Sequence, residues 1–174
     1  MMRRLPLKEL PRYECLIEAA QLYPELDPSA CEVYLNLIHI VDLLSEKEEA
    51  YLAKYDLSQA RFVVLKLLSI AEEGSVKSSD IADRAAVSKA TMTGLLDALE
   101  RQGLIERIIG KEDRRVIFVK LSKKGKSLLA RMTPGYFKCI SQMTSVLREE
   151  ERKRIVASMQ KIKTELARKE QSSK

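Results

Sequence analysis

The segment from Val76 to Leu121 constrains the fold more than any other part of the chain. Its pattern predicts a short helix, a tight turn, a second helix and then two strands. The second helix has apolar residues spaced i, i+3, i+4 and i+7 on one stripe: Met92, Leu95, Leu96 and Leu99. Ser88 is a suitable N-cap for this helix, which runs to about Gln102, and Gly103 is a typical residue to end it.

The first helix of the segment is short. We expect Ser78 and Ser79 to accept the free backbone N–H groups at its start, and Ala86-Val87-Ser88 to form the turn. Its apolar side consists of Ile81, Ala82 and Ala85. Two helices with so short a turn and small residues at their crossing are typical of a helix-turn-helix, whose second helix enters the major groove of DNA. The alternative is an ordinary helical hairpin in an all-α core.

The outward face of the second helix favours the first interpretation. It presents small or hydrogen-bonding residues with one cation near the start: Lys89, Ala90, Thr91, Thr93, Gly94 and Asp97. Such residues suit contacts with base edges, which the N-terminal part of a recognition helix makes.

A charged hairpin follows the second helix. Residues 104–109 and 115–121 are rich in β-branched and apolar side chains, as strands are, and Gly110-Lys111-Glu112-Asp113-Arg114 lies between them. We interpret the hairpin as a wing whose arginines reach the adjacent minor groove, where the negative potential is enhanced. The alternative is a solvated turn in which Arg114 and Arg115 pair locally with Asp113.

Three segments carry a resemblance to a known family: LSQARFVVLKLL (57–68), DIADRAAVSKATMTGLLDALERQGLIER (80–107) and EDRRVIFVKLSKKGK (112–126). Their most specific part is the D-x-R of the wing followed by L-[ST]-x-x-G. Over roughly residues 28–170 the sequence resembles the MarR family of winged-helix transcriptional regulators. The resemblance implies a mainly α fold with a small β-wing, in which N- and C-terminal dimerisation helices flank a winged helix-turn-helix.

The resemblance also implies which residues contact DNA. Asp113 and Arg115 match the wing pair of the family, whose arginine inserts into the minor groove. Gly94 and Ala98 stand where many members carry arginine, which removes two possible contacts. The predicted DNA-binding residues are Ser78, Ser88, Lys89, Ala90, Thr91, Thr93, Lys111, Asp113, Arg114 and Arg115.

The charge of the chain is concentrated near the proposed wing. The formal net charge is +6. Between Ile105 and Lys126, eight cations face three anions. A basic patch of this kind fits a polyanionic partner.

Five further helices are predicted. They run from Arg12 to Tyr23, from Pro28 to about Lys54, from Ser58 to Glu73-Gly74, from Ser122 to about Leu147 with a kink or break at Pro134-Gly135, and from near Arg148 towards the C-terminus. The second of them is apolar on two faces at its start, so it needs a second surface to cover it, and a partner subunit would supply one. We therefore expect residues 1–56 and 127–174 to form a homodimer around a DNA-binding domain at 57–126.

The family resemblance suggests a sensor. Members often respond to small aromatic or phenolic anions bound between the dimer helices and the winged-helix lobe. By position, that crevice would draw on Tyr34, Ile38, His39, Phe62, Lys66, Leu129 and Met132. The helix at 12–23 is either a leader packed on the dimer or an extra wall of this site. The urate-sensing branch also has such a helix but uses a tryptophan, which this chain lacks.

A thiol sensor is the competing interpretation. Cys31 lies near the start of a long helix, where another branch of the family carries a reactive cysteine, but it also lies in an apolar stripe, where cysteine is commonly inert. Cys15, Cys31 and Cys139 show no metal-ligand spacing. His39 is the lone histidine, and the sequence has no P-loop, dinucleotide fingerprint or serine elbow. We predict no cofactor, no metal and no enzymatic activity.

These patterns lead to one main hypothesis. The chain is predicted to be a cytoplasmic, sequence-specific transcriptional regulator, a repressor, that binds a near-palindromic operator in double-stranded DNA as a homodimer and has no membrane segment. The alternative of another class is a winged-helix module that binds an acidic protein surface. Such a module would more often expose aromatic residues or leucines on the wing and recognition face, and the sequence shows none there.

Overall fold

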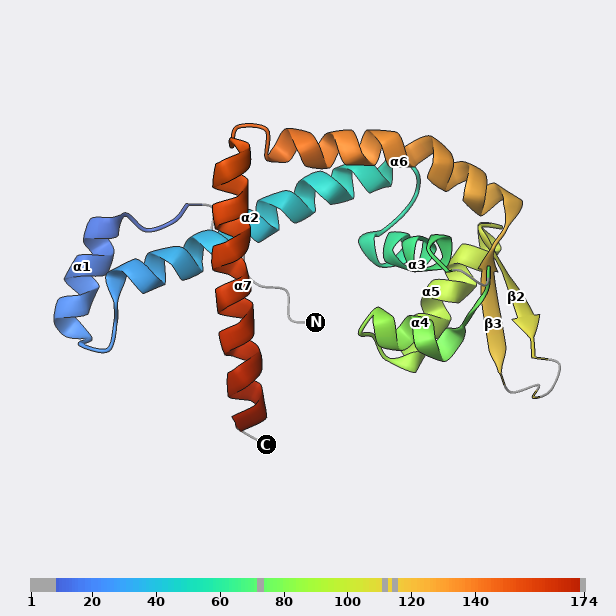
Figure 1. Ribbon diagram of the computed structural model, residues 1–174, viewed down its shortest axis with the longest axis horizontal. Helices are drawn as coiled ribbons and strands as arrows, with labels where there is room; N and C mark the ends of the chain where they lie inside the picture. Colours follow the sequence, from blue (N-terminus) through green and yellow to red (C-terminus); the bar gives the residue numbers. More distant parts are fainter. Residues whose placement is uncertain (1–8, 72–73, 111–112, 114–115, 173–174) are drawn as a thin grey trace. The chain divides into compact units, whose positions relative to one another are not determined.

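A computed structural model describes residues 9–71, 74–110, 113 and 116–172. The helices are α1 (Tyr13–Leu22), α2 (Pro28–Ala53), α3 (Gln59–Ser69), α4 (Ser78–Arg84), α5 (Lys89–Arg101), α6 (Lys123–Met143) and α7 (Glu149–Ser172), and the strands are β1 (Val76–Lys77), β2 (Ile105–Ile109) and β3 (Ile117–Leu121) (Figure 1). The chain divides into two units, Met1–Ala130 and Arg131–Lys174, with the boundary inside α6. The mainly helical fold with a small β-wing is the predicted one.

The three strands form an antiparallel sheet in the order β1-β3-β2. β2 and β3 pair from Ile105 with Leu121 to Ile109 with Ile117, which is the predicted hairpin. β1 was not predicted, because a two-residue strand has no periodicity of its own. It exists through its pairing with Val119 and Phe118 at the free edge of β3.

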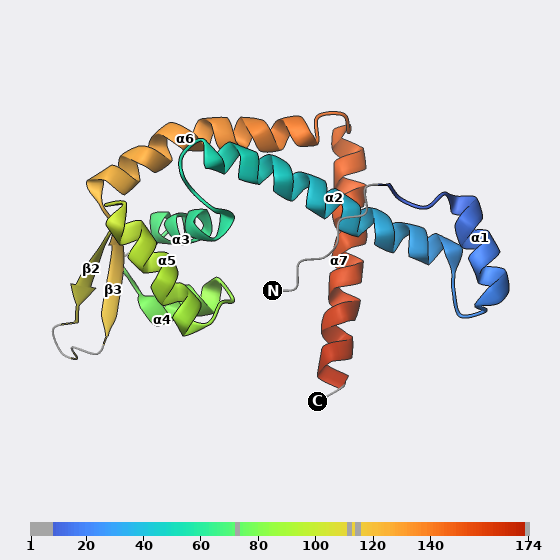
Figure 2. The same cartoon turned by 180° about the vertical axis from the view of Figure 1, so that it is seen from behind.

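The core of the first unit lies where α3, α4 and α5 meet the sheet. These helices contact one another or β3, and both ribbon views show them gathered beside the strands (Figures 1 and 2). The buried residues include Phe62, Val64, Leu65, Leu68, Ile81, Ala82, Met92, Leu96, Leu99, Leu104, Ile105, Val119 and Leu121. This packing fixes the orientation of α5, whose predicted stripe supplies three of these side chains.

The helices before this core begin as predicted. The Asp27 carboxylate accepts hydrogen bonds from the backbone N–H groups of Ser29 and Ala30 at 2.9 and 3.1 Å, and Pro28 occupies the first turn of α2. α1 contacts α2 and buries Leu16. The hydrogen bonds at Asp27, first that from the Ser29 hydroxyl, hold the pKa of its carboxyl below the ordinary value of 3.8.

Two helix ends differ from the prediction. α3 ends at Ser69 instead of near Gly74, and the Ser69 hydroxyl donates to the carbonyl of Lys66 at 2.8 Å. A serine side chain that bonds the backbone in this way competes with continuation of the helix.

At α4 the N-cap is Lys77, with no side-chain cap, and the Ser79 hydroxyl donates to Asp80. The predicted capping by Ser78 and Ser79 is therefore wrong, because pairing of β1 with β3 fixes where α4 starts.

α6 runs without interruption from Lys123 to Met143 although Pro134 lies inside it. The sequence predicted a kink or a break at Pro134-Gly135, and the break does not occur. In the second unit, α7 begins with Glu149, Glu150 and Glu151, whose charges suit the positive end of a helix dipole. The backbone N–H of Arg148 donates to Glu151 at 2.7 Å and is the main reason that the pKa of the Glu151 carboxyl lies below its ordinary value.

α7 exposes an apolar stripe made of Ile155, Val156, Met159, Ile162 and Leu166. No described residue of Arg131–Lys174 covers these side chains, which are all at least 40% exposed. Within the described residues, no helix combines the length and the apolar character that crossing a bilayer demands.

Candidate nucleic-acid interface

The start of α5 is fixed by its cap. The Ser88 hydroxyl accepts a hydrogen bond from the backbone N–H of Thr91 at 3.1 Å and lies 2.9 Å from the Thr91 hydroxyl. Ala86, in the turn before it, has the left-handed φ of 52°. The N-cap prediction is confirmed, and the first turn of α5 is a defined, solvent-facing element.

The residues predicted for the outward face of this turn are exposed: Ser88, Lys89, Ala90, Thr91 and Thr93. Thr93 donates its hydroxyl hydrogen to the carbonyl of Lys89 at 3.0 Å, so the oxygen lone pairs stay available as acceptors. Lys89 forms no ion pair with any described residue. A β-carbon at Gly94 would meet nothing within 4 Å. This face therefore presents one cation and small polar groups to any molecule that binds close to the helix backbone.

A hollow of about 450 Å³ lies between the start of α4, the start of α5 and β3. It is lined by Lys77, Ser78, Ser79, Ala82, Lys89, Met92, Thr93, Val116 and Ile117. The structure thus brings together three predicted residues, Ser78, Lys89 and Thr93. Sequence reasoning missed Lys77 as a member of this site, because Lys77 enters it through the unpredicted strand β1.

The wing is closed near its tip by two backbone hydrogen bonds. Gly110 N–H donates to the carbonyl of Val116 at 2.8 Å, and Val116 N–H donates to that of Asp113 at 3.0 Å. A β-carbon at Gly110 would lie 2.6 Å from the Asp113 carbonyl, so only glycine fits. Asp113 is exposed. Lys111, Arg114 and Arg115 lie outside the described residues, and their contacts with DNA stay predictions.

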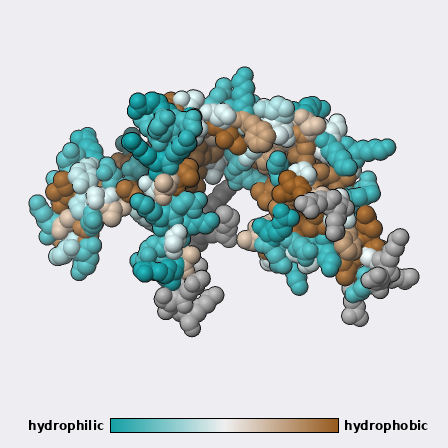
Figure 3. Space-filling model, viewed as in Figure 1, coloured by the Kyte–Doolittle hydropathy of each residue, from teal (hydrophilic) through white to brown (hydrophobic). Residues whose placement is uncertain are grey.

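The sheet also exposes isoleucines. Ile108, Ile109 and Ile117 are 39%, 65% and 40% exposed, and apolar surface is visible where β2 and β3 lie (Figure 3). Ile109 and Ile117 form a cross-strand pair at the end of the ladder near the tip. The sequence analysis did not expect this apolar surface.

Two of the cations counted at the wing are neutralised by partners. Arg107 on β2 contacts Asp97 on α5 at 2.6 Å and Glu100 at 3.4 Å. Lys120 contacts Glu106 across the hairpin at 2.9 Å. Asp97, expected on the outward face, is thus engaged with the wing strand. The sequence analysis counted Arg107 and Lys120 in a basic patch for a polyanion. That expectation was wrong for these two residues, because each is paired with an acidic side chain.

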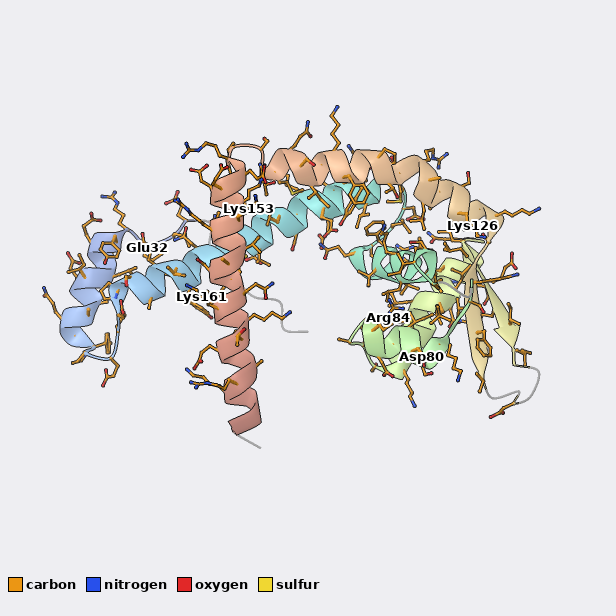
Figure 4. All side chains as sticks on the ribbon, in the orientation of Figure 1. Glu32, Asp80, Arg84, Lys126, Lys153 and Lys161 are labelled. Carbon is orange, nitrogen blue, oxygen red and sulfur yellow. The ribbon has the colours of Figure 1, made fainter. Side chains whose placement is uncertain are left out.

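A second hollow, of about 400 Å³, lies on another side of α4. Its lining includes Lys77, Asp80, Arg84 and Phe118. Asp80 and Arg84 lie one helical turn apart on α4 (Figure 4). Arg84 pairs with no acidic side chain in the described part of the chain, and Lys77 lines both hollows. The second hollow therefore carries two cations and the Asp80 carboxylate.

The predicted ligand residues occupy different environments. Phe62 and Leu129 are buried in the first unit, Tyr34 is 59% exposed, and Ile38, His39 and Lys66 are half-buried. Met132 is buried and belongs to the second unit. The ligand crevice therefore stays a prediction.

The cysteines are free thiols. Cys15 is exposed, and Cys31 and Cys139 are half-buried. Cys31 lies in the first turns of α2, and its backbone N–H donates to the carbonyl of Asp27. No three His, Cys, Asp or Glu side chains come together as a possible metal site in the part of the chain that the structure describes.

Comparison with known proteins decides the family. The MarR family model matches residues 57–117, which span the helix-turn-helix and β2 and end where β3 begins. The HTH-type transcriptional repressor YetL of Bacillus subtilis (strain 168) is 36% identical over 148 residues, or 85% of this chain and 89% of the relative. The chain belongs to the MarR family.

Solved structures show the same fold around this MarR-family interface. AbsC of Streptomyces coelicolor, a MarR family transcriptional regulator, matches with a TM-score of 0.72 at 21% identity and covers 81% of this chain and 95% of its own. The S. aureus MepR–DNA complex matches with a TM-score of 0.68 at 25% identity and covers 76% and 96%. These similar proteins are described as transcription regulators or their DNA complexes and not as enzymes.

Proposed function

We propose that this MarR-family chain is a sequence-specific regulator that binds double-stranded DNA through α5, the start of α4 and the wing. The hollow that combines Ser78, Lys89 and Thr93 carries the proposal. Small polar groups line it next to an exposed helix face, together with the Lys89 ammonium, which pairs with no acidic side chain among the described residues. α5 would enter the major groove, and the wing would lie along the adjacent minor groove. The structural neighbour MepR, which was solved as a complex with DNA, supports DNA binding.

The proposed assembly is a homodimer. α2 exposes Val33, Tyr34, Ile40 and Val41, and α7 exposes its own apolar stripe. The surroundings of the two stripes carry opposite charge: residues 9–53 contain ten acidic and two basic side chains, and residues 152–169 contain seven basic and one acidic. Glu32 on α2 and Lys153 and Lys161 on α7 are examples (Figure 4). Exposed stripes of this size are typical of protein–protein interfaces, and a second copy would cover them.

A two-fold dimer presents two α5 helices, so the proposed operator is a near-palindrome with half-sites about one helical turn apart. Relatives that are named as repressors, YetL among them, support repression as the mode of action. The protein would act in the cytoplasm, where its DNA target lies. We further propose that a small aromatic or phenolic anion at Tyr34, Ile38, His39, Phe62, Lys66, Leu129 and Met132 releases the operator.

Binding to an acidic protein is the second candidate function. The exposed Ile108, Ile109 and Ile117 on the sheet favour it, because exposed apolar side chains are common in protein interfaces.

A redox role for Cys31 rests on its half-buried position near the start of α2. Treatment with peroxide that leaves DNA binding unchanged would remove the redox hypothesis.

The deciding experiment is fluorescence anisotropy with the DNA upstream of the protein's own gene, at several salt concentrations. We expect tight binding by two subunits, with affinity lower by about 10³-fold or more between 50 and 200 mM salt. Lys89→Gln should make the slope of log affinity against log salt shallower by about 2, because each of the two subunits loses one cation, whereas Lys138→Gln at an exposed position of α6 should leave the slope unchanged. Weak, sequence-blind binding with no effect of Lys89→Gln would overturn the DNA-binding proposal in favour of a protein partner.

A further inference from the structure

The residues that follow α5 are held by a segment far away in the sequence. The side-chain amide of Gln102, the C-cap of α5, donates from Nε2 to the Asp56 carboxylate at 2.8 Å and to the Asp56 carbonyl at 3.1 Å. Asp56 lies between α2 and α3. The amide therefore links the end of the proposed recognition helix to the point where α2 turns into α3.

Asp56 is held in an unusual backbone conformation at this link. Its φ is 54°, in the left-handed region that non-glycine residues seldom adopt. The next N–H, of Leu57, donates back to the carbonyl of Leu52 at 3.2 Å, so the chain reverses directly after α2. This turn aims both acceptors of Asp56 at the same amide nitrogen.

The start of α6 also holds the C-terminal end of α5. The Lys124 ammonium donates to the Gln102 carbonyl at 2.8 Å, and the Ser122 hydroxyl donates to the Gly103 carbonyl at 2.6 Å. A β-carbon at Gly125 would lie only 2.1 Å from the Leu104 carbonyl, so the first turn of α6 sits directly on this backbone. Residues 102–104 thus lie between the end of α2 and the start of α6.

The orientation of the Gln102 amide costs free energy, because it leaves a buried oxygen without a hydrogen bond to any described residue. Its oxygen, Oε1, is buried and has no hydrogen-bond partner among the described residues. A buried acceptor without a partner is unfavourable, and the two bonds from Nε2 to Asp56 offset it. The amide is thus held in one direction, towards Asp56.

We propose that Gln102 is a positioning residue through which α2 and α6 set the angle of α5, and that this angle sets the half-site spacing the protein accepts. The inference rests on the proposed function, since it needs a dimer that reads two half-sites. In such a dimer, a small rotation of α5 about its C-terminal end moves its N-terminal residues relative to the groove. The bridge to Asp56 restricts that rotation.

The test measures affinity for the operator with its natural half-site spacing and for versions one base pair shorter and one longer, by fluorescence anisotropy. We expect the full-length wild-type protein to discriminate strongly between them. Gln102→Ala should lower that discrimination by about tenfold, which corresponds to the loss of about 1.4 kcal/mol. Gln102→Lys should restore it, because an ammonium also donates to Asp56, and Gln102→Glu should not, because two carboxylates repel.

Gln59→Ala is the matched control. Gln59 Nε2 donates to the Glu48 carboxylate at 2.7 Å, so it also joins α2 to α3 through an amide and a carboxylate. No hydrogen bond from its side chain to α5 is present among the described residues. We expect Gln59→Ala to lower the melting temperature about as much as Gln102→Ala and to leave the spacing preference intact.

The outcomes separate the two proposals. If the wild-type protein binds no operator specifically, the proposed function fails. If it discriminates spacing and Gln102→Ala keeps the wild-type profile, the positioning role of Gln102 is wrong. An equal loss of discrimination in Gln59→Ala would also overturn it, since the effect would then follow stability alone.

Discussion

Gly94 lies in the middle of α5 on the face proposed to meet DNA. A β-carbon there has open space, and glycine in a helix interior costs about 1 kcal/mol relative to alanine. We therefore predict that Gly94→Ala raises the free energy of unfolding by about that amount in urea denaturation. If α5 approaches the bases closely, the same variant should bind operator DNA more weakly. A variant that is more stable and binds equally well would show that this face does not contact DNA.

The Asp27 cap predicts a pH dependence. The pKa of its carboxyl is lower in the folded protein than its ordinary value of 3.8, so the folded state prefers the ionised form. Its contribution to stability is present above pH 3.8 and is lost as the pH falls through the lowered pKa.

Asp27→Asn keeps a capping residue and removes the charge. We expect the urea midpoint of the wild-type protein to exceed that of Asp27→Asn at pH 7, and the difference to shrink as the pH falls below 3.8. The two curves can be followed by circular dichroism. A difference that stays constant over this range would contradict the assignment.

At the scale of elements, Arg107 makes the ion pairs that join the wing to α5 among the described residues. Arg107 spans Asp97 and Glu100 from β2, with a quarter of its side chain exposed. We predict that Arg107→Ala lowers the free energy of unfolding by about 1–2 kcal/mol, after allowance for solvent screening. It should also lower operator affinity by about tenfold, because the wing and α5 lose their fixed relation.

Lys120→Ala is the control for this prediction. It removes the Lys120–Glu106 pair of the same hairpin, which does not involve α5. We expect a change in the unfolding free energy of less than about 1 kcal/mol and a smaller loss of affinity than for Arg107→Ala. Equal effects on DNA binding would mean that Arg107 acts through its charge and not through its contact with α5.

The elements themselves were predicted unevenly. α5 and the β2–β3 hairpin follow from local patterns: the stripe from Met92 to Leu99 and two β-branched runs around a charged tip. The start of α4 does not, because β1 fixes it through pairing with residues of β3 about forty positions later in the chain. The end of α3 was placed too late because a serine hydroxyl competes locally with the helix.

For the whole molecule, the exposed stripe of α7 predicts self-association. Ile162→Lys places a charge in that stripe and should raise the dimer dissociation constant by at least about tenfold, since burial of an aliphatic side chain contributes about 1.5–3 kcal/mol. Sedimentation equilibrium measures it. Ala157→Lys, at an exposed position on the opposite side of the helix from the centre of the stripe, should leave the dimer intact. If the dimer stays intact in both variants, another surface holds the two subunits together.

The sequence by itself determined the helix-turn-helix, the hairpin and the exposed residues at the start of α5, because these depend on periodicity and capping within a few residues. The family followed from resemblance to known sequences. Only the tertiary structure decided which of them work together. Arg107 meets Asp97 ten positions earlier, and Gln102 meets Asp56 across 46 positions. Such contacts exist only after helices and strands have packed, because packing sets which distant side chains come within hydrogen-bond reach.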